Sequence, residues 1–147
     1  MEPMIAQRIQ GVQRVFVDTA PLIYYIQRDP RYFESINHVF RRVDEGGLIA
    51  VTSSVTLAEC LVLPYRQGKI ELAQRFIDQI VFGKNTLFVA IDHDMACRAA
   101  ELRARYNLAL DDSFQIAACL GSECDAFLTN DKELQRVSEI GIILLEQ

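Results

Sequence analysis

Five short apolar segments, separated by stretches with helical periodicity, constrain this fold more than any other feature of the sequence. The apolar segments cover residues 15–17, 48–52, 86–91, 125–129 and 141–145. They are continuous apolar runs, which are typical of strands buried on both faces of a parallel sheet. The stretches between them predict helices. We therefore expect an α/β fold with a central parallel sheet of about five strands and helices on both faces.

Turn and capping residues set the ends of the predicted helices. The first helix covers residues 20–27 and ends near Asp29-Pro30, because the residue before a proline disfavours the helical conformation. Another helix begins at Ser53 or Ser54 and runs towards Pro64. Further helices are predicted across residues 32–43, 72–80, 95–106, 111–120 and 132–137.

The length and composition indicate one domain. The chain has 147 residues, of which 50% are hydrophobic, and this is enough to bury a sizeable core. We expect a single domain over residues 1–147, with a core over residues 15–145. Residues 1–14 are expected to form an N-terminal extension, either an ordered helix or a tail.

Cysteine usage and hydropathy point to the cytoplasm. No apolar run approaches the ~20 residues that a membrane span needs, and the N-terminus lacks the pattern of a secretory signal. Cys60, Cys97, Cys119 and Cys124 stand among apolar neighbours without a CxxC pair. We interpret them as buried free thiols of a cytoplasmic protein without membrane contact.

Acidic residues recur where strands end or helices begin. Asp18 follows the first predicted strand, Asp131 follows the fourth, and Asp111 and Asp112 open the helix over residues 111–120. Each acid could simply cap a helix. Sites in parallel sheets, however, form outside the carboxyl ends of the strands. We therefore expect these acids to gather at one place.

Glu59 is an acid in the apolar stretch TLAECLVL. Burying a charge alone costs several kcal/mol, so this position calls for a partner or a metal ion. The alternative is a capping box with Thr56. That alternative requires the helix to begin at Thr56, whereas Ser53 or Ser54 is the more natural start.

Converging carboxylates repel one another unless a divalent cation neutralises them. Their hard oxygen atoms suit Mg²⁺ or Mn²⁺, which can activate water and stabilise charge in a phosphate displacement. The net charge of −5 argues against binding nucleic acid through a basic surface alone, and such a cation would supply positive charge. Arg66 and Lys69, the basic residues nearest to the Glu59 helix in sequence, are candidates for phosphate steering.

Other chemistries lack their parts. The sequence has no GxGxxG, GxxxxGK or GxSxG motif. Neither His38 nor His93 lies in one of the acid-bearing stretches, which disfavours a histidine-based ribonuclease. A phosphatase or receiver-like domain stays open, although it normally places two acids near the first strand, where Asp18 stands alone.

Four segments together resemble the successive acidic motifs of the PIN domain family: VFVDTAPLIYYI, TLAECL, LALDDSFQIAACL and DAFLTNDKEL. The short single-domain form is similar to the VapC-type toxin ribonucleases. The resemblance covers about residues 15–145 and implies a PIN-like three-layer sandwich. It selects Asp112 over Asp111, which is then left as a helix cap. It implies that the catalytic, metal-holding acids are Asp18, Glu59, Asp112 and Asp131, with Thr19 and Thr129 as supporting groups.

The activity that this resemblance implies is hydrolysis of RNA phosphodiesters by a water activated by Mg²⁺ or Mn²⁺. An endoribonuclease of this type would be the toxin of a type II toxin–antitoxin pair, with a small antitoxin as partner, and it would form a homodimer. Two alternatives stay open: a catalytically inactive PIN-fold interaction module, and a stand-alone RNA-processing nuclease.

Overall fold

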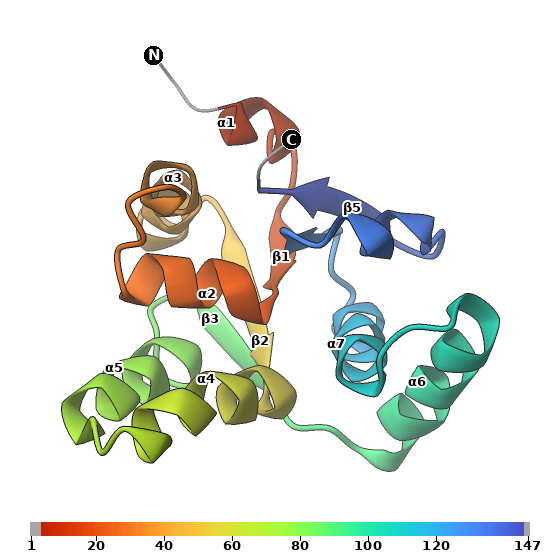
Figure 1. The fold of residues 1–147 in the computed structure, drawn as a ribbon. Coiled ribbons are helices and arrows are strands. Elements are labelled where there is room, and N and C mark those ends of the chain that lie inside the picture. The colour runs from red at the N-terminus through yellow and green to blue at the C-terminus, as the bar shows by residue number, and fades with distance from the viewer. Residues whose placement is uncertain (1–3, 146–147) are drawn as a thin grey trace.

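A single parallel sheet lies at the centre of the protein in the computed structural model, which describes residues 4–145 (Figure 1). Its strands are β1 (Arg14–Val17), β2 (Ile49–Ser53), β3 (Thr86–Val89), β4 (Ala126–Thr129) and β5 (Gly141–Leu144). They are arranged in the order β3-β2-β1-β4-β5, and each neighbouring pair is parallel. The predicted α/β class and the five-stranded parallel sheet are confirmed.

Helices cover both faces of the sheet. They are α1 (Ile5–Arg8), α2 (Thr19–Ile26), α3 (Phe33–Asp44), α4 (Ser54–Arg66), α5 (Ile70–Ile80), α6 (His93–Tyr106), α7 (Leu110–Gly121) and the 3-10 helix η1 (Lys132–Arg136). Figure 1 shows α2 to α5 on one side of the sheet and α6 and α7 on the other. Successive side chains of β1 point to opposite faces, as strand geometry requires: Val15 and Val17 join one core cluster, and Phe16 joins the other.

The strand order changes direction at β1, and this positions the candidate site. The chain adds β2 and β3 on one side of β1 and then returns to place β4 on the other side. A crevice for ligands is expected outside the carboxyl ends of strands at such a switch point. Val17 is in register with Leu128, and the Asp18 amide donates to the Leu128 carbonyl at 2.9 Å. The residues that follow β1 and β4 therefore lie side by side.

The N-terminal segment takes part in the core. Ile5 and Ile9 are buried in the same cluster as β1, and α1 packs on α3. Residues 1–3 of the predicted extension lie outside the described residues. Of the two forms expected for this segment, an ordered helix is therefore found over Ile5–Arg8.

Two local features refine the predictions. The helix that was predicted to run towards Pro64 extends two residues further, to Arg66. Cys60 and Cys119 are buried and Cys124 is half-buried, but Cys97 is exposed. The prediction of a buried thiol is wrong at Cys97 because the buried residues of α6 lie elsewhere on that helix. None of the helices within residues 4–145 combines the length and the apolar character that a membrane span requires.

Candidate active site

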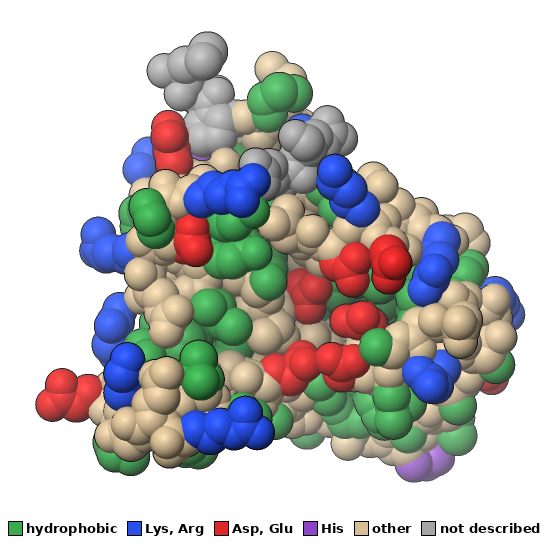
Figure 2. Space-filling model, viewed as in Figure 1, with side chains coloured by type: hydrophobic (Ala, Val, Ile, Leu, Met, Phe, Trp, Pro, Cys, Tyr) green, Lys and Arg blue, Asp and Glu red, His purple; other side chains and the backbone are tan. Residues whose placement is uncertain are grey.

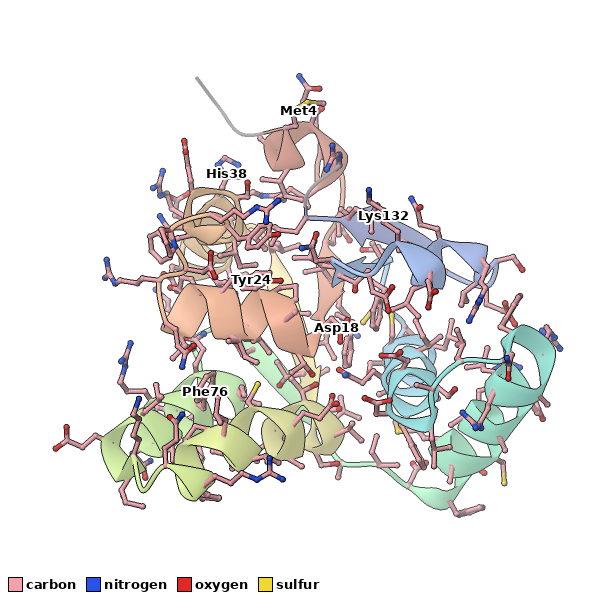
Figure 3. All side chains as sticks on the ribbon, viewed as in Figure 1. Met4, Asp18, Tyr24, His38, Phe76 and Lys132 are labelled. Carbon is pink, nitrogen blue, oxygen red and sulfur yellow. The ribbon has the colours of Figure 1, made fainter. Side chains whose placement is uncertain are left out.

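Asp18 lies at the start of α2, on the side facing α7 (Figure 3). Its side chain is the N-cap of α2, because Oδ1 accepts from the Thr19 amide at 2.8 Å. Capping is only part of its role in the fold, since Oδ2 also accepts from Thr129 Oγ1 at 2.7 Å. Burial raises the pKa of Asp18, and the hydrogen bond from Thr129 opposes this effect. A nearly buried carboxylate is thus fixed at the switch point.

Glu59 reaches the same place from α4. Its Oε1 accepts from Thr19 Oγ1 at 2.8 Å. Since α4 begins at Ser54 and Ser53 is its N-cap, the capping-box alternative for Glu59 is wrong. The pKa of Glu59 is raised to about 7. Burial is the largest cause, and a hydrogen bond shared with Asp111 is the second. Glu59 therefore faces other acids instead of a cation.

Asp111 and Asp112 both belong to the first turn of α7. The helix begins one residue earlier than predicted, and its N-cap is Ala109, without a side-chain cap. The interpretation of Asp111 as a cap is therefore wrong, and Asp111 contacts Glu59 instead. The pKa of Asp112 is also raised to about 7. Burial is the largest cause, and the negative charges of Asp111 and Asp18 add to it.

Asp131 and Thr129 complete the site from the end of β4. The Asp131 side chain accepts from the Glu133 amide at 3.0 Å and so caps η1, as the capping alternative predicted. Its charge nevertheless contributes to the raised pKa values of Asp18 and Asp112. Thr129 Oγ1 accepts from the Asp131 amide at 3.0 Å and donates to Asp18, so one hydroxyl links the two loops.

These acids converge on one region, and none of the ion pairs described in the structure brings a basic partner to them. Figure 2 shows Asp and Glu side chains gathered in the middle of one face, with Lys and Arg side chains around them. No ion pair described within residues 4–145 involves Asp18, Glu59 or Asp112. The pKa values of all three acids are raised for the same reason. Burial and the repulsion between the acids disfavour the charged carboxylates, and no positive charge in the described part of the chain is among the leading causes of these shifts.

The donor set fits a hard divalent cation that keeps part of its water shell. Every acidic group here offers oxygen atoms, which Mg²⁺ and Mn²⁺ prefer. In the described part of the chain, no three His, Cys, Asp or Glu side chains stand close enough together to enclose a metal ion as placed. Mg²⁺ does not require such a cage, since it is typically bound through one or two carboxylates, several waters and substrate phosphates.

The structure does not bring the predicted steering residues to the acids. Arg66 lies in the last turn of α4 and Lys69 immediately precedes α5. Arg66 is about two helical turns, or roughly 10 Å along the axis, beyond Glu59. A surface pocket of about 530 Å³ at this turn is lined by Gly68, Lys69, Ile70, Glu71, Leu72 and Arg75. That pocket contains none of the clustered acids, and we place the candidate chemistry at the acids.

Gln115 is a member of the site that the sequence analysis missed. It is 1% exposed, and its amide contacts Asp18, Thr19 and Glu59. A signal was present, because a polar residue three positions after Asp112 lies on the same helix face. The surrounding run FQIAACL is otherwise apolar, so the pattern indicates a core-facing helix and does not single out Gln115 for the site.

Comparisons with known proteins agree with the observed fold. A family model described as PIN domain matches residues 15–140. Among solved structures, the chain is similar to VapBC2 from Rickettsia felis bound to a DNA fragment from its promoter, with 16% identity and a TM-score of 0.70 over 90% of this chain and 98% of that chain. Sequence comparison with curated proteins gives no match.

Two further solved structures show the same likeness. VapC20 from Mycobacterium tuberculosis, described as a sarcin-ricin loop cleaving toxin, has 15% identity and a TM-score of 0.66, with 86% of this chain and 98% of that chain covered. DNA-bound VapBC from Salmonella typhimurium has 22% identity and a TM-score of 0.65, with 90% and 98% covered. At these identities, the likeness shows that the chains share a fold.

Proposed function

Because the chain belongs to the PIN domain family, we propose that it is a metal-dependent endoribonuclease and the toxin of a type II toxin–antitoxin pair. One observation carries this proposal: Asp18, Glu59 and Asp112 come from three different elements and lie in one region, where burial and neighbouring acids raise the pKa of each. Perturbed carboxylates clustered at a switch point are typical of a catalytic site. The family membership also removes the receiver-like alternative.

The proposed ligands of the cation are Asp18, Glu59, Asp112 and Asp131, and the cation is Mg²⁺ or Mn²⁺. When bound, it would supply positive charge to the phosphate of the substrate and would activate a water molecule. Thr19 and Thr129 are the proposed supporting groups, because their hydroxyls donate to Glu59 and Asp18 at 2.8 and 2.7 Å. These hydrogen bonds orient the two carboxylates before any substrate arrives.

The substrate side of the proposal is an RNA phosphodiester. The chain carries a net charge of −5, so the acids would repel RNA unless the cation were present. Arg66 and Lys69 stay candidates for steering phosphates at longer range, because exposed charges act over about a Debye length of 8–10 Å. A single domain over residues 1–147 would carry the whole activity.

The toxin assignment is supported by the solved relatives. VapBC2 and the Salmonella VapBC are both described as bound to DNA, and VapC20 is described as cleaving the sarcin-ricin loop. We infer by similarity an RNA substrate, a small antitoxin partner and a homodimer. A cytoplasmic location fits the free thiols of Cys60 and Cys119, which the structure buries.

The test is cleavage of a panel of structured RNAs by the purified chain, with Mg²⁺ or Mn²⁺ and with a chelator. We expect cleavage that requires the metal. Metal binding without cleavage of any RNA would favour the inactive interaction module. Metal-dependent cleavage by a chain that has no small antitoxin reading frame beside its gene would favour the stand-alone processing nuclease. Cleavage that survives chelation would refute the mechanism.

A further inference from the structure

Gln115 is a buried amide that contacts acidic residues from two other parts of the fold. It lies in α7, and its side-chain nitrogen is 3.0 Å from Asp18 Oδ1 and 2.9 Å from Glu59 Oε1. Asp18 follows β1 and Glu59 belongs to α4. The described hydrogen bonds therefore include one side chain that contacts both carboxylates directly.

The orientation of this amide is set by the two carboxylates, and a hydroxyl on its other side completes the hydrogen bonding. Thr56 Oγ1 donates to Gln115 Oε1 at 2.8 Å, and Thr56 is fully buried. Because ionised carboxylates only accept hydrogen bonds, the amide nitrogen must face Asp18 and Glu59, and the amide oxygen is left to accept from the Thr56 hydroxyl. A flipped amide would direct its oxygen at two carboxylates and remove the one side-chain donor that both of them share.

The two hydrogens of the amide match the two carboxylates. The nitrogen of Gln115 is also 3.1 Å from Thr19 Oγ1, but the Thr19 hydroxyl donates its own hydrogen to Glu59 Oε1. An amide NH₂ has only two hydrogens, and ionised acceptors bind them more strongly than a neutral hydroxyl does. Asp18 and Glu59 are therefore the preferred acceptors.

We propose that Gln115 is a positioning residue that bridges Asp18 and Glu59 and holds them side by side for a shared divalent cation. This inference rests on the proposed function. The neutral amide orients both carboxylates and leaves their negative charges in place. A lysine or arginine at this position would orient them too, but its charge would compete with the cation.

The experiment measures Mn²⁺ binding to the RNA-free protein by electron paramagnetic resonance. Gln115→Met keeps the length of the side chain and removes the donor. Mutation of a residue that orients metal ligands typically lowers metal affinity by about 10–100-fold. We therefore expect the Mn²⁺ affinity of Gln115→Met to be at least about tenfold lower than that of the wild type. The matched control is Gln74→Met, since Gln74 also donates to a carboxylate, Asp78, at 2.9 Å, but on the exposed face of α5. The control is expected to bind Mn²⁺ as the wild type does.

A second variant covers the case in which Gln115→Met fails to fold. Thr56→Val removes the hydroxyl that donates to the amide oxygen and leaves Gln115 in place. We expect a smaller loss of Mn²⁺ affinity in the same direction, because the amide then keeps its bonds to the carboxylates but loses the bond that anchors its other end. Cooperative thermal unfolding of each variant establishes that it is folded.

RNA cleavage provides a readout that a purely structural role would not change. We expect Gln115→Met to lower kcat at a fixed Mn²⁺ concentration, to leave the KM for RNA unchanged, and to recover activity with excess Mn²⁺. Wild-type affinity for Mn²⁺ in both Gln115→Met and Thr56→Val would overturn the inference and leave the proposed function standing. A wild-type protein that neither binds Mn²⁺ nor cleaves RNA in its presence would overturn both.

Discussion

Glu59→Gln is expected to stabilise the metal-free protein at neutral and alkaline pH. The substitution conserves shape, and the oxygen of the new amide can still accept from Thr19 and Gln115, as Glu59 Oε1 does. The new amide nitrogen would donate to Asp111, which now shares a hydrogen bond with Glu59. The variant thus removes a negative charge from an acidic cluster without leaving a buried group unpaired.

The magnitude follows from the pKa of Glu59, which is raised from its ordinary value of 4.5 to about 7, mainly by burial. Because the folded-state pKa lies above the unfolded value, the favourable contribution is complete below pH ~4.5 and is lost as the pH rises to about 7. At about 1.4 kcal/mol per pH unit, this gap gives an upper bound of roughly 3.5 kcal/mol. Glu59 is only partly buried, and solvent screening reduces the expected gain to about 1–2 kcal/mol.

The assay is urea and thermal unfolding in chelator at pH 8 and pH 5. For a chain of this length, a gain of 1–2 kcal/mol corresponds to an increase in Tm of roughly 3–6 °C at pH 8. Most of this difference should disappear at pH 5, where Glu59 of the folded protein is protonated. The control is Glu101→Gln, since Glu101 lies on an exposed face of α6, 3.3 Å from Arg98, and should change stability by less than about 0.5 kcal/mol. A Glu59→Gln variant that is less stable than the wild type at pH 8 would refute this reasoning. So would a gain in stability over the wild type that is equally large at pH 8 and at pH 5.

Three further predictions concern activity and local stability. Asp18→Asn and Asp112→Asn should each lower the rate of RNA cleavage by at least about 100-fold, because each removes a proposed metal ligand. The far-ultraviolet circular dichroism should stay unchanged. Cleavage at the wild-type rate would contradict the role of these acids as ligands. Thr129→Val should lower the free energy of unfolding by about 1–2 kcal/mol in urea titrations, because it removes the donor to Oδ2 of the nearly buried Asp18. An unchanged urea midpoint would argue against a stabilising role for this hydrogen bond. Arg66→Ala combined with Lys69→Ala should raise the KM for RNA a few-fold at low salt with kcat unchanged, and the effect should vanish at high salt; a salt-independent loss of kcat would exclude steering.

The sheet was predictable because each strand is a short, continuous apolar run. The segment at 15–17 and the observed β1 (Arg14–Val17) differ by one residue, and the predicted 86–91 differs from β3 (Thr86–Val89) only at its end. Parallel strands buried on both faces need apolar residues at every position, so the pattern survives without knowledge of the neighbours. The role of Ile5 and Ile9 was not visible, because two apolar residues in a short segment do not reveal where that segment packs.

The acids at strand ends were predictable for a similar reason, whereas their contacts were not. A parallel sheet brings the ends of β1 and β4 to one edge, and this predicts that Asp18 and Asp131 are neighbours. The contact of Asp111 with Glu59 depends on where α7 begins and how it faces α4, and a helix start is hard to place within one residue. Gln115 was missed because its importance comes from the acids that surround it in space.

The central claim is that acids distant in the sequence share one hard cation, and a crystal of the protein soaked in Mn²⁺ tests it most directly. The anomalous difference map should show a peak within about 2.0–2.5 Å of a carboxylate oxygen of Asp18, with Glu59, Asp112 and Asp131 around it. In crystals of Asp18→Asn, the same peak should be weak or absent. A map without a peak at these acids at saturating Mn²⁺, or with its peak on another surface of the molecule, would contradict the account.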